Sequence, residues 1–339
     1  MSPPLKLQRK SMQTTESIKR RMKSAGDLLS VVKTMKALAA VSIRQYQRAV
    51  ESLTDYNRTV EMGLQIVLKE RMEPPAQTKA LTIKRLGAIV FGSDQGLCGQ
   101  LNEQISVFSL EHMKNIGVKK ENRMVLSVGA RVADYVEDAG QPIYEVLTTP
   151  SSTAGITPLV QEIIMIIDEW HFRHQVDHFL LFYNKYLTGA SYSPHLVQLL
   201  PVNREWLKEI AKKKWDSKSL PIFRMDGDLI FTSLIREYLF VSLYRAFAES
   251  LASENASRLA SMQNAEKNIE EQLQELHGQF HRQRQMTITE ELLDIVAGFE
   301  ALSEKKEQPI VSQKEGDSHD GRKTHMRHMR LAQRMSKKI

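Results

Sequence analysis

The chain has 339 residues, of which 42% are hydrophobic and 26% charged, a composition typical of a protein that folds in water. Its only cysteine is Cys98, which excludes an intramolecular disulfide and a cysteine-based metal cluster. No apolar run reaches the ~18 residues of a membrane-spanning helix, and the start of the chain lacks the apolar core of a secretory signal. We therefore expect a cytoplasmic protein that can still be peripheral to a membrane. The net charge of +7 favours an acidic partner, such as nucleic acid, anionic lipid or an acidic protein surface.

The N-terminal part of the chain predicts a long helix, because no proline lies between Pro4 and Pro74. We expect this helix over residues 17–73, after an N-terminal extension over residues 1–16. Its apolar residues recur at alternating steps of four and three, the seam of a coiled coil: Ile18, Met22, Ala25, Leu29 and Val32. Around this seam Asp27 is the only acid among many basic residues: Lys19, Arg20, Arg21, Lys23, Lys33, Lys36, Arg44 and Arg48. The pattern fits either a solvated charged face or a contact with an acidic partner.

The C-terminal part also predicts a long helix, since no proline lies between Pro221 and Pro309. A helix over residues 227–302 would be about 110 Å long at 1.5 Å per residue. A globular core cannot cover such a helix, so we expect it to pair with the N-terminal helix as a long antiparallel coiled coil. It has an apolar seam of its own: Leu259, Met262, Ile269, Leu273, Leu276 and Phe280. Residues 303–339 are polar and basic and are expected to form a disordered tail.

Between these helices, residues 80–220 predict a compact α/β domain. Four short apolar runs have strand character: Leu86–Phe91, Met124–Val128, Ile143–Leu147 and Phe179–Tyr183. Helical stretches lie between them: Asn102–Lys114, Ala130–Asp138 and Ile156–Phe172. This alternation predicts parallel βαβ units and a Rossmann-like layered sheet. A further strand at His195–Leu200 is expected at an edge, and Lys208–Lys218 is expected to be a polar connection to the second helix.

The segment Ser93–Gly99, SDQGLCG, follows a strand and precedes a helix, and it has two interpretations. It could bind a nucleotide, but it matches neither of the glycine-rich phosphate-binding fingerprints. A tight turn that needs glycine at positive φ fits better. Cys98 within it is either a reactive thiol or, with better support, a small packed side chain. No nucleophile–base set or carboxylate pair marks an active site, so no catalytic residue, metal or cofactor is predicted.

Four segments together resemble the γ subunit of F-type ATP synthases. The resemblance lies in these segments, which occur in the family's order and cover roughly residues 15–302: IKRRMKSAGDLLSVVKTMKALAAVSI (18–43), SDQGLCGQLN (93–102), ESLASENASRLASMQNAEKNI (249–269) and RQMTITEELLDIVAGFEAL (284–302). The residues that carry the family's motifs are Ser93, Asp94, Gly96, Leu97, Cys98, Gly99, Glu249, Ser250, Glu254, Arg258, Thr289 and Glu291.

The resemblance implies a central rotor stalk with no catalytic site of its own. The paired helices would stand inside a ring of α and β subunits, and the α/β domain would lie against the ε subunit and the membrane c-ring. The chain would couple ion-driven rotation to the catalytic sites of the β subunits, at the cytoplasmic face of the cell membrane. The family's contacts between rotor and ring would fall on Arg284, Gln285, Met35 and Lys33.

The sequence also departs from the family. Gln95 stands where the family usually has Arg, and Gln100 where it has Gly, while Asp27–Val32 replaces a more polar run. These departures indicate a divergent bacterial or alternative form of the γ subunit. Two rival interpretations stay open: an α/β enzyme with coiled-coil arms, and a scaffold whose basic tail binds nucleic acid or a membrane. Neither accounts for the helix motifs, and no nucleic-acid partner is expected.

Overall fold

The computed structural model describes residues 14–70, 83–189, 191–215, 218–219 and 221–304. The described residues up to Phe280 form one compact unit, and those from His281 belong to a second. The first contains α1 (Thr15–Glu70), an α/β domain and most of α6 (Gly227–Glu304). Among all the described residues, no helix combines the length and the apolar character needed to cross a membrane.

The α/β domain is built on one five-stranded sheet with the order β3-β2-β1-β4-β5. The strands are β1 (Leu86–Phe91), β2 (Arg123–Val128), β3 (Glu145–Leu147), β4 (His178–Tyr186) and β5 (Tyr192–Leu200). The first four are mutually parallel, and β5 pairs antiparallel with β4 at the edge. The four predicted strands are therefore confirmed, with β3 beginning at Glu145, as are the predicted edge strand and the Rossmann-like α/β class.

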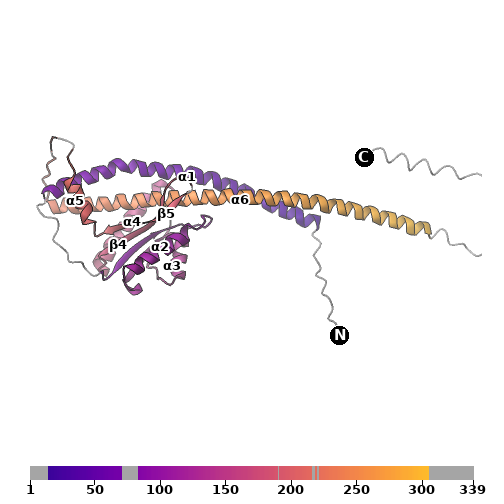
Figure 1. Cartoon of the computed structure of the whole chain (residues 1–339), viewed down its shortest axis with the longest axis horizontal. Helices are drawn as coiled ribbons and strands as arrows, with labels where there is room; N and C mark the ends of the chain where they lie inside the picture. Colours follow the sequence, from indigo (N-terminus) through magenta and orange to yellow (C-terminus); the bar gives the residue numbers. More distant parts are fainter. Residues whose placement is uncertain (1–13, 71–82, 190, 216–217, 220, 305–339) are drawn as a thin grey trace, which may run out of the picture. The chain divides into compact units, whose positions relative to one another are not determined.

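Helices cover both faces of this sheet (Figure 1). One face packs against α2 (Leu101–Asn115) and α3 (Ala130–Asp138) through a core that includes Ile105 and Val132. The other face packs against α4 (Ile156–His174) and α6 through a larger core that includes Trp170 and Phe247. Two short 3₁₀ turns, η1 (Lys120–Asn122) and η2 (Thr153–Gly155), complete the domain. Helix α6 thus belongs both to the helix pair and to the domain.

Helices α1 and α6 run antiparallel, which confirms the predicted pairing (Figure 1). Lys19 near the start of α1 lies 5.6 Å from the ring centroid of Phe280, whereas Val60 and Leu64 near its end pack with Leu234. Between these ends, the predicted seams meet in a cluster made by Ala25, Leu29, Val32, Met35, Met262, Ala265, Ile269 and Leu273. The heptad patterns therefore identified the side chains that face each other.

The prediction of a polar connection at Lys208–Lys218 is wrong for its first part. The structure has helix α5 (Arg204–Lys212) there, capped by Asn203, whose side chain accepts hydrogen bonds from the amides of Glu205 and Trp206. Ile210 of this helix is buried with α1 and with the first turns of α6. Because α5 has few apolar residues, its sequence resembles a polar connection, although the structure shows an amphipathic helix.

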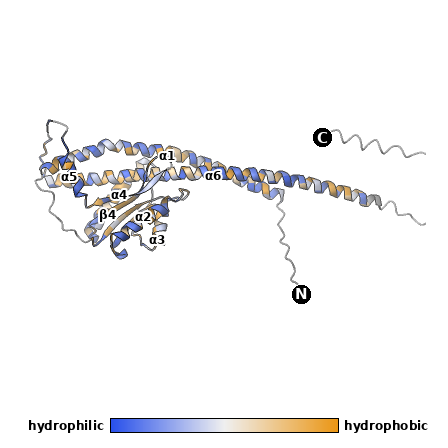
Figure 2. Cartoon of the chain, viewed as in Figure 1, coloured by the Kyte–Doolittle hydropathy of each residue, from blue (hydrophilic) through white to orange (hydrophobic). Residues whose placement is uncertain are grey.

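The second unit is described from His281 to Glu304, where it forms the last turns of α6. Several large apolar side chains are exposed there, and Figure 2 shows apolar colour on these turns: Met286, Ile288, Leu292, Leu293, Ile295, Val296 and Phe299. The helix continues two residues past the predicted end at 302. The predicted extension over residues 1–16 and the predicted tail lie largely outside the described residues, which begin at 14 and end at 304.

Candidate functional site

The loop after β1 forms a tight turn that is stabilised by its own side chains. Asn102, at the start of α2, accepts a hydrogen bond from the amide of Ser93 at 2.9 Å and donates one to the Ser93 hydroxyl at 2.8 Å. Gly99 has a φ of 58°, as the turn interpretation requires, but Leu97 also has a positive φ of 64°. A non-glycine residue rarely adopts this conformation, and Leu97 is 59% exposed.

Asp94 joins this loop to two other segments of the domain. One carboxylate oxygen accepts a hydrogen bond of 2.9 Å from the amide of Ala130, the first residue of α3. The other accepts bonds of 2.7 Å from the amide and the hydroxyl of Thr149, which follows β3. A carboxylate at a helix N-terminus is favoured by the helix dipole. Asp94 therefore fixes the arrangement of three segments, and none of its bonds involves a group outside the domain.

Helix α6 docks directly on this loop. The hydroxyl of Ser257 donates a hydrogen bond of 2.6 Å to the carbonyl of Cys98, and a Cβ added to Gly99 would lie 3.2 Å from the same hydroxyl. One turn earlier on α6, the hydroxyl of Ser253 donates a bond of 2.8 Å to the carbonyl of Asn184 on β4. Ligands of Rossmann-like sheets bind at the carboxyl ends of the strands. Here α6 covers one side of the loop after β1 through Ser257, which favours the turn interpretation of the loop over nucleotide binding.

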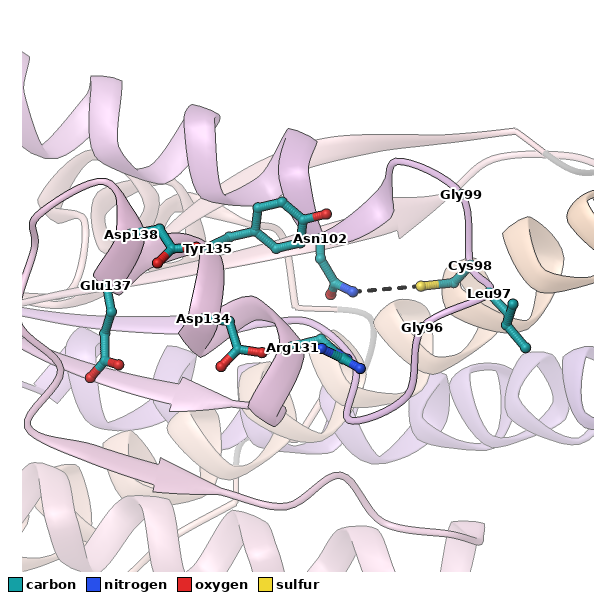
Figure 3. Close-up of a pocket in the computed structure, with 10 residues that line it drawn as sticks. All are labelled: Gly96, Leu97, Cys98, Gly99, Asn102, Arg131, Asp134, Tyr135, Glu137 and Asp138. Carbon is teal, nitrogen blue, oxygen red and sulfur yellow. Dashed lines mark hydrogen bonds and ion pairs between the residues drawn. The ribbon is translucent and has the colours of Figure 1, made fainter. Parts of the chain in front are cut away.

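The contact of α6 with the sheet and with the loop after β1, which includes Ser253, Ser257 and Cys98, is called the junction. Cys98 is a packed side chain within it. It is 1% exposed, and the side-chain amide of Asn102 points to its sulfur at 3.6 Å, as Figure 3 shows. Burial raises the pKa of the thiol, and the charge of Glu254 adds to the effect. A buried thiol with a raised pKa is a poor nucleophile. The structure thus supports the packed interpretation of Cys98 over the reactive one.

The signature of α6 adds a buried ion pair to the junction. Glu254 accepts a hydrogen bond of 2.6 Å from Arg258, one turn further along, and the two side chains are 8% and 14% exposed. Burial raises the pKa of Glu254, whereas Arg258 lowers it. Glu249 lies beside Tyr183, and burial together with the Glu249 charge raises the pKa of that phenol. Ser250 is buried nearby.

The outer side of the loop borders a polar surface groove of about 630 Å³ (Figure 3). Gly96, Leu97 and Gly99 form one wall, and α3 forms the other with Arg131, Asp134, Tyr135, Glu137 and Asp138. Arg131 and Asp134 pair at 3.4 Å. Among the described residues, no group of three or more His, Cys, Asp or Glu side chains is placed to hold a metal ion. The groove offers a surface for contact, and its lining shows no nucleophile–base arrangement.

Comparison with known proteins identifies the family. The family model described as ATP synthase matches residues 14–302, which is most of the chain. Curated relatives that match over nearly their whole length are ATP synthase γ chains. The chain belongs to the γ-subunit family of F-type ATP synthases.

Two of these relatives show how far this γ chain has diverged. The γ chain of Pasteurella multocida is 29% identical over 299 residues, which cover 86% of this chain and 100% of the relative. The γ chain of Buchnera aphidicola subsp. Diuraphis noxia is 26% identical over 293 residues, covering 86% and 99%. The shared region therefore includes both long helices and the α/β domain.

Solved structures share the fold of this γ chain. The rotor of the Euglena gracilis mitochondrial ATP synthase contains a chain with a TM-score of 0.58 and 15% identity, covering 81% of this chain and 98% of that one. A second structure of that enzyme, with OSCP, F1 and c-ring, contains a chain with a TM-score of 0.60 and 16% identity, covering 89% and 99%. At sequence identities this low, the structural similarity shows a shared fold and nothing more.

Two of the predicted contact residues of the γ chain lie in the helix pair itself. Lys33 Nζ is 3.2 Å from Glu270 and 3.9 Å from Glu266, so it takes part in an ion pair between α1 and α6. Lys36 also bonds Glu266. Met35 is half-buried against the seam of α1 and α6. Lys33 therefore has a partner within the chain. Met35 packs in the seam, and part of its side chain stays accessible to solvent.

The other two predicted contact residues lie in the second unit. Arg284 and Gln285 are exposed on α6, as are the motif residues Thr289 and Glu291. The hydroxyl of Thr289 donates a hydrogen bond of 2.9 Å to the carbonyl of Gln285 within the helix. The junction, by contrast, gathers the motif residues of the loop and of the α6 signature. It also includes Ser253 and Ser257, whose roles were not predicted because serine on a helix gives no signal of a distant partner.

Proposed function

We propose that this γ chain is the central rotor stalk of an F-type ATP synthase, with no catalytic site of its own. In this role it couples rotation driven by ion flow through the c-ring to conformational change at the catalytic sites of the β subunits. The observation that carries the proposal is the junction, where α6 is both one helix of the helix pair and a buried layer of the α/β domain. A force applied to the domain therefore reaches the helix pair through buried contacts rather than through a flexible linker.

The proposed partners are the α and β subunits, the ε subunit and the membrane c-ring. The similar solved structures are those of rotor and of F1 and c-ring assemblies, which supports these partners. The chain would be a peripheral component at the cytoplasmic face of the cell membrane, held there through the complex. The exposed basic residues of α1, such as Arg21 and Lys23, are suited to acidic surfaces of the ring.

Rotation of the α/β domain against an immobilised ring tests the function directly. Glu111 is exposed on α2, and the single native cysteine is buried, so Glu111→Cys provides one accessible thiol for a probe. In the assembled complex, the probe should rotate in one direction during ATP hydrolysis. The native chain, treated with the same reagent, is the control for labelling. A complex that hydrolyses ATP at the normal rate while the probe stays still would overturn the proposal.

The proposed contact between rotor and ring is the pair Arg284 and Gln285. The guanidinium of Arg offers a planar fork of donors suited to a carboxylate, and the Gln amide both donates and accepts beside it. Both side chains are exposed in the described chain and so are available to a partner. This assignment comes from the match of RQMTITEELLDIVAGFEAL to the family's C-terminal segment, and its test is given in the Discussion.

A further inference from the structure

Over nearly three turns, the contact between α6 and the sheet includes buried polar side chains beside its apolar core. Five buried side-chain atoms along it have no hydrogen-bond partner among the described residues: Asn184 Oδ1, Arg245 Nε, Glu249 Oε2, Ser250 Oγ and Glu254 Oε2. Buried polar atoms in proteins are normally bonded to protein or to ordered water. An interface of this kind is less firmly fixed than an apolar one, because its free energy depends on how each polar group is satisfied.

Glu254 is the member of this group that faces a cavity. One carboxylate oxygen accepts the hydrogen bond from Arg258, whereas the other is buried and has no hydrogen-bond partner among the described residues. A cavity of about 230 Å³ that is partly open to solvent lies beside it, bounded by Ser42 and Tyr46 of α1, by the loops after β1 and β3, and by α6. At ~30 Å³ per molecule, such a space admits several waters. The cavity thus lies where α1, α6 and the domain meet.

The charged and titratable groups that face Glu254 come from three segments. Arg258 on α6 favours the carboxylate form, whereas Asp94 in the loop after β1 opposes it. Tyr46 on α1 and Cys98 in the loop have raised pKa values, to which the charge of Glu254 contributes. Burial is the largest cause acting on Glu254, and it raises the pKa above the ordinary value of 4.5.

We propose that Glu254 and the cavity beside it form a proton-operated latch between α6 and the α/β domain. When Glu254 is protonated, its buried oxygen carries no charge and the junction packs tightly. When Glu254 is ionised, water from the cavity moves in to solvate the buried carboxylate oxygen, and the junction loosens. This device sits on the proposed path of torque, so it would make the link between domain and shaft more compliant as the pH rises.

The direction of the pH effect follows from linkage. Packing raises the pKa of Glu254, so the packed junction binds a proton more readily than the opened one. The stabilising contribution is complete below pH 4.5, the ordinary pKa, and is lost as the pH rises through the raised pKa. Opening should become more frequent by about tenfold for each unit by which the pKa is raised.

Hydrogen exchange in the assembled complex tests the latch. Amide exchange is followed between pH 5 and 8 in two parts of the chain: residues 245–260, which contain the latch, and residues 262–276, which correct for the intrinsic pH dependence of exchange. In the native chain, protection of the first part relative to the second should fall as the pH rises. In Glu254→Gln, which keeps the shape and the bond to Arg258 but cannot titrate, relative protection should stay at its low-pH level.

The matched control is Glu271→Gln, because Glu271 lies on the same helix with its side chain 65% exposed. This variant should keep the native pH response. The latch is overturned if the native chain shows no pH-dependent loss of relative protection, a result that needs no variant to fold. It is also overturned if Glu254→Gln keeps the native response. ATP turnover and rotation are measured on the same preparation, so a complex that rotates without a pH response contradicts the latch and leaves the proposed function intact.

Discussion

Ser257 Oγ on α6 donates a hydrogen bond of 2.6 Å to the carbonyl of Cys98, although 159 residues separate the two in the sequence. The bond joins the C-terminal helix to the loop after the first strand of the domain. Both groups are buried, and this bond is the shorter of two that the carbonyl of Cys98 accepts, the other being from the amide of Leu101 at 3.4 Å. Two segments that carry family motifs therefore meet in one contact.

The first prediction concerns this bond. Ser257→Ala should lower the free energy of unfolding by about 0.5–1.5 kcal/mol, because the buried carbonyl of Cys98 keeps only its longer bond from the amide of Leu101. Ser233→Ala is the matched control, since Ser233 lies on the same helix, is exposed, and bonds only the carbonyl of Leu229 one turn before. Thermal unfolding of the purified chains compares the two. Equal losses in both variants would mean that the bond to Cys98 does not hold the junction.

A second prediction concerns the reactivity of Cys98. Because burial raises the pKa of its thiol and covers its sulfur, alkylation at pH 8 should be at least roughly tenfold slower than at the exposed cysteine of Glu111→Cys. Mass spectrometry of the native and the denatured chain measures both rates. Denaturation should abolish the difference. Rapid labelling of Cys98 in the native chain would show that the junction opens far more often than the packing suggests.

The elements of the fold could largely be predicted, because their signals are local. The seam of Ile18 and Val32 at alternating steps of four and three identified α1 as half of a helix pair, and β1 was predicted with its observed ends. Helix α5 was missed because only a few apolar side chains, among them Leu207 and Ile210, face the core of an otherwise charged segment. The sequence carries one local signal for this helix, the cap residue Asn203 directly before it.

The junction could be predicted only in part, because it depends on contacts between distant segments. The motif residues Asp94 and Glu254 were singled out by resemblance, but their roles differ: Asp94 joins three segments of the domain, whereas Glu254 pairs with Arg258. Nothing in the sequence assigns the Ser257 hydroxyl to Cys98, because a serine on a helix most often bonds its own helix or water. Lys33 was expected at a partner surface, but its ion pair with Glu270 depends on the register of two helices.

A third prediction concerns Met35. Met35→Lys should permit assembly but uncouple ATP hydrolysis from ion pumping, because the added ammonium group can form ion pairs with acidic groups of the ring as the shaft turns. Met35 is half-buried beside Lys33 and Lys36, whose acidic partners lie on α6, so a third cation would be poorly satisfied within the chain. ATPase activity and ion uptake are measured in the same vesicles. Met35→Leu keeps the volume and should stay coupled. Unchanged coupling in Met35→Lys would leave Met35 as a seam residue only.

The last prediction tests the contact proposed for Arg284 and Gln285. Charge-assisted hydrogen bonds contribute about 1.5–3 kcal/mol each, enough to bias one conformation of the ring and still break at each step of rotation. Replacing both residues by alanine should therefore slow ATP turnover of the assembled complex by tenfold or more, while the helix content seen by circular dichroism stays unchanged. The chain provides a matched control in the neighbouring pair Arg282 and Gln283, which has the same composition but projects from a different side of the helix. Alanine at both of those positions should leave turnover within about twofold of the native rate. If the two double variants behave alike, the effect belongs to the loss of charge on this part of α6, and the assignment of Arg284 and Gln285 to a specific contact with the ring fails.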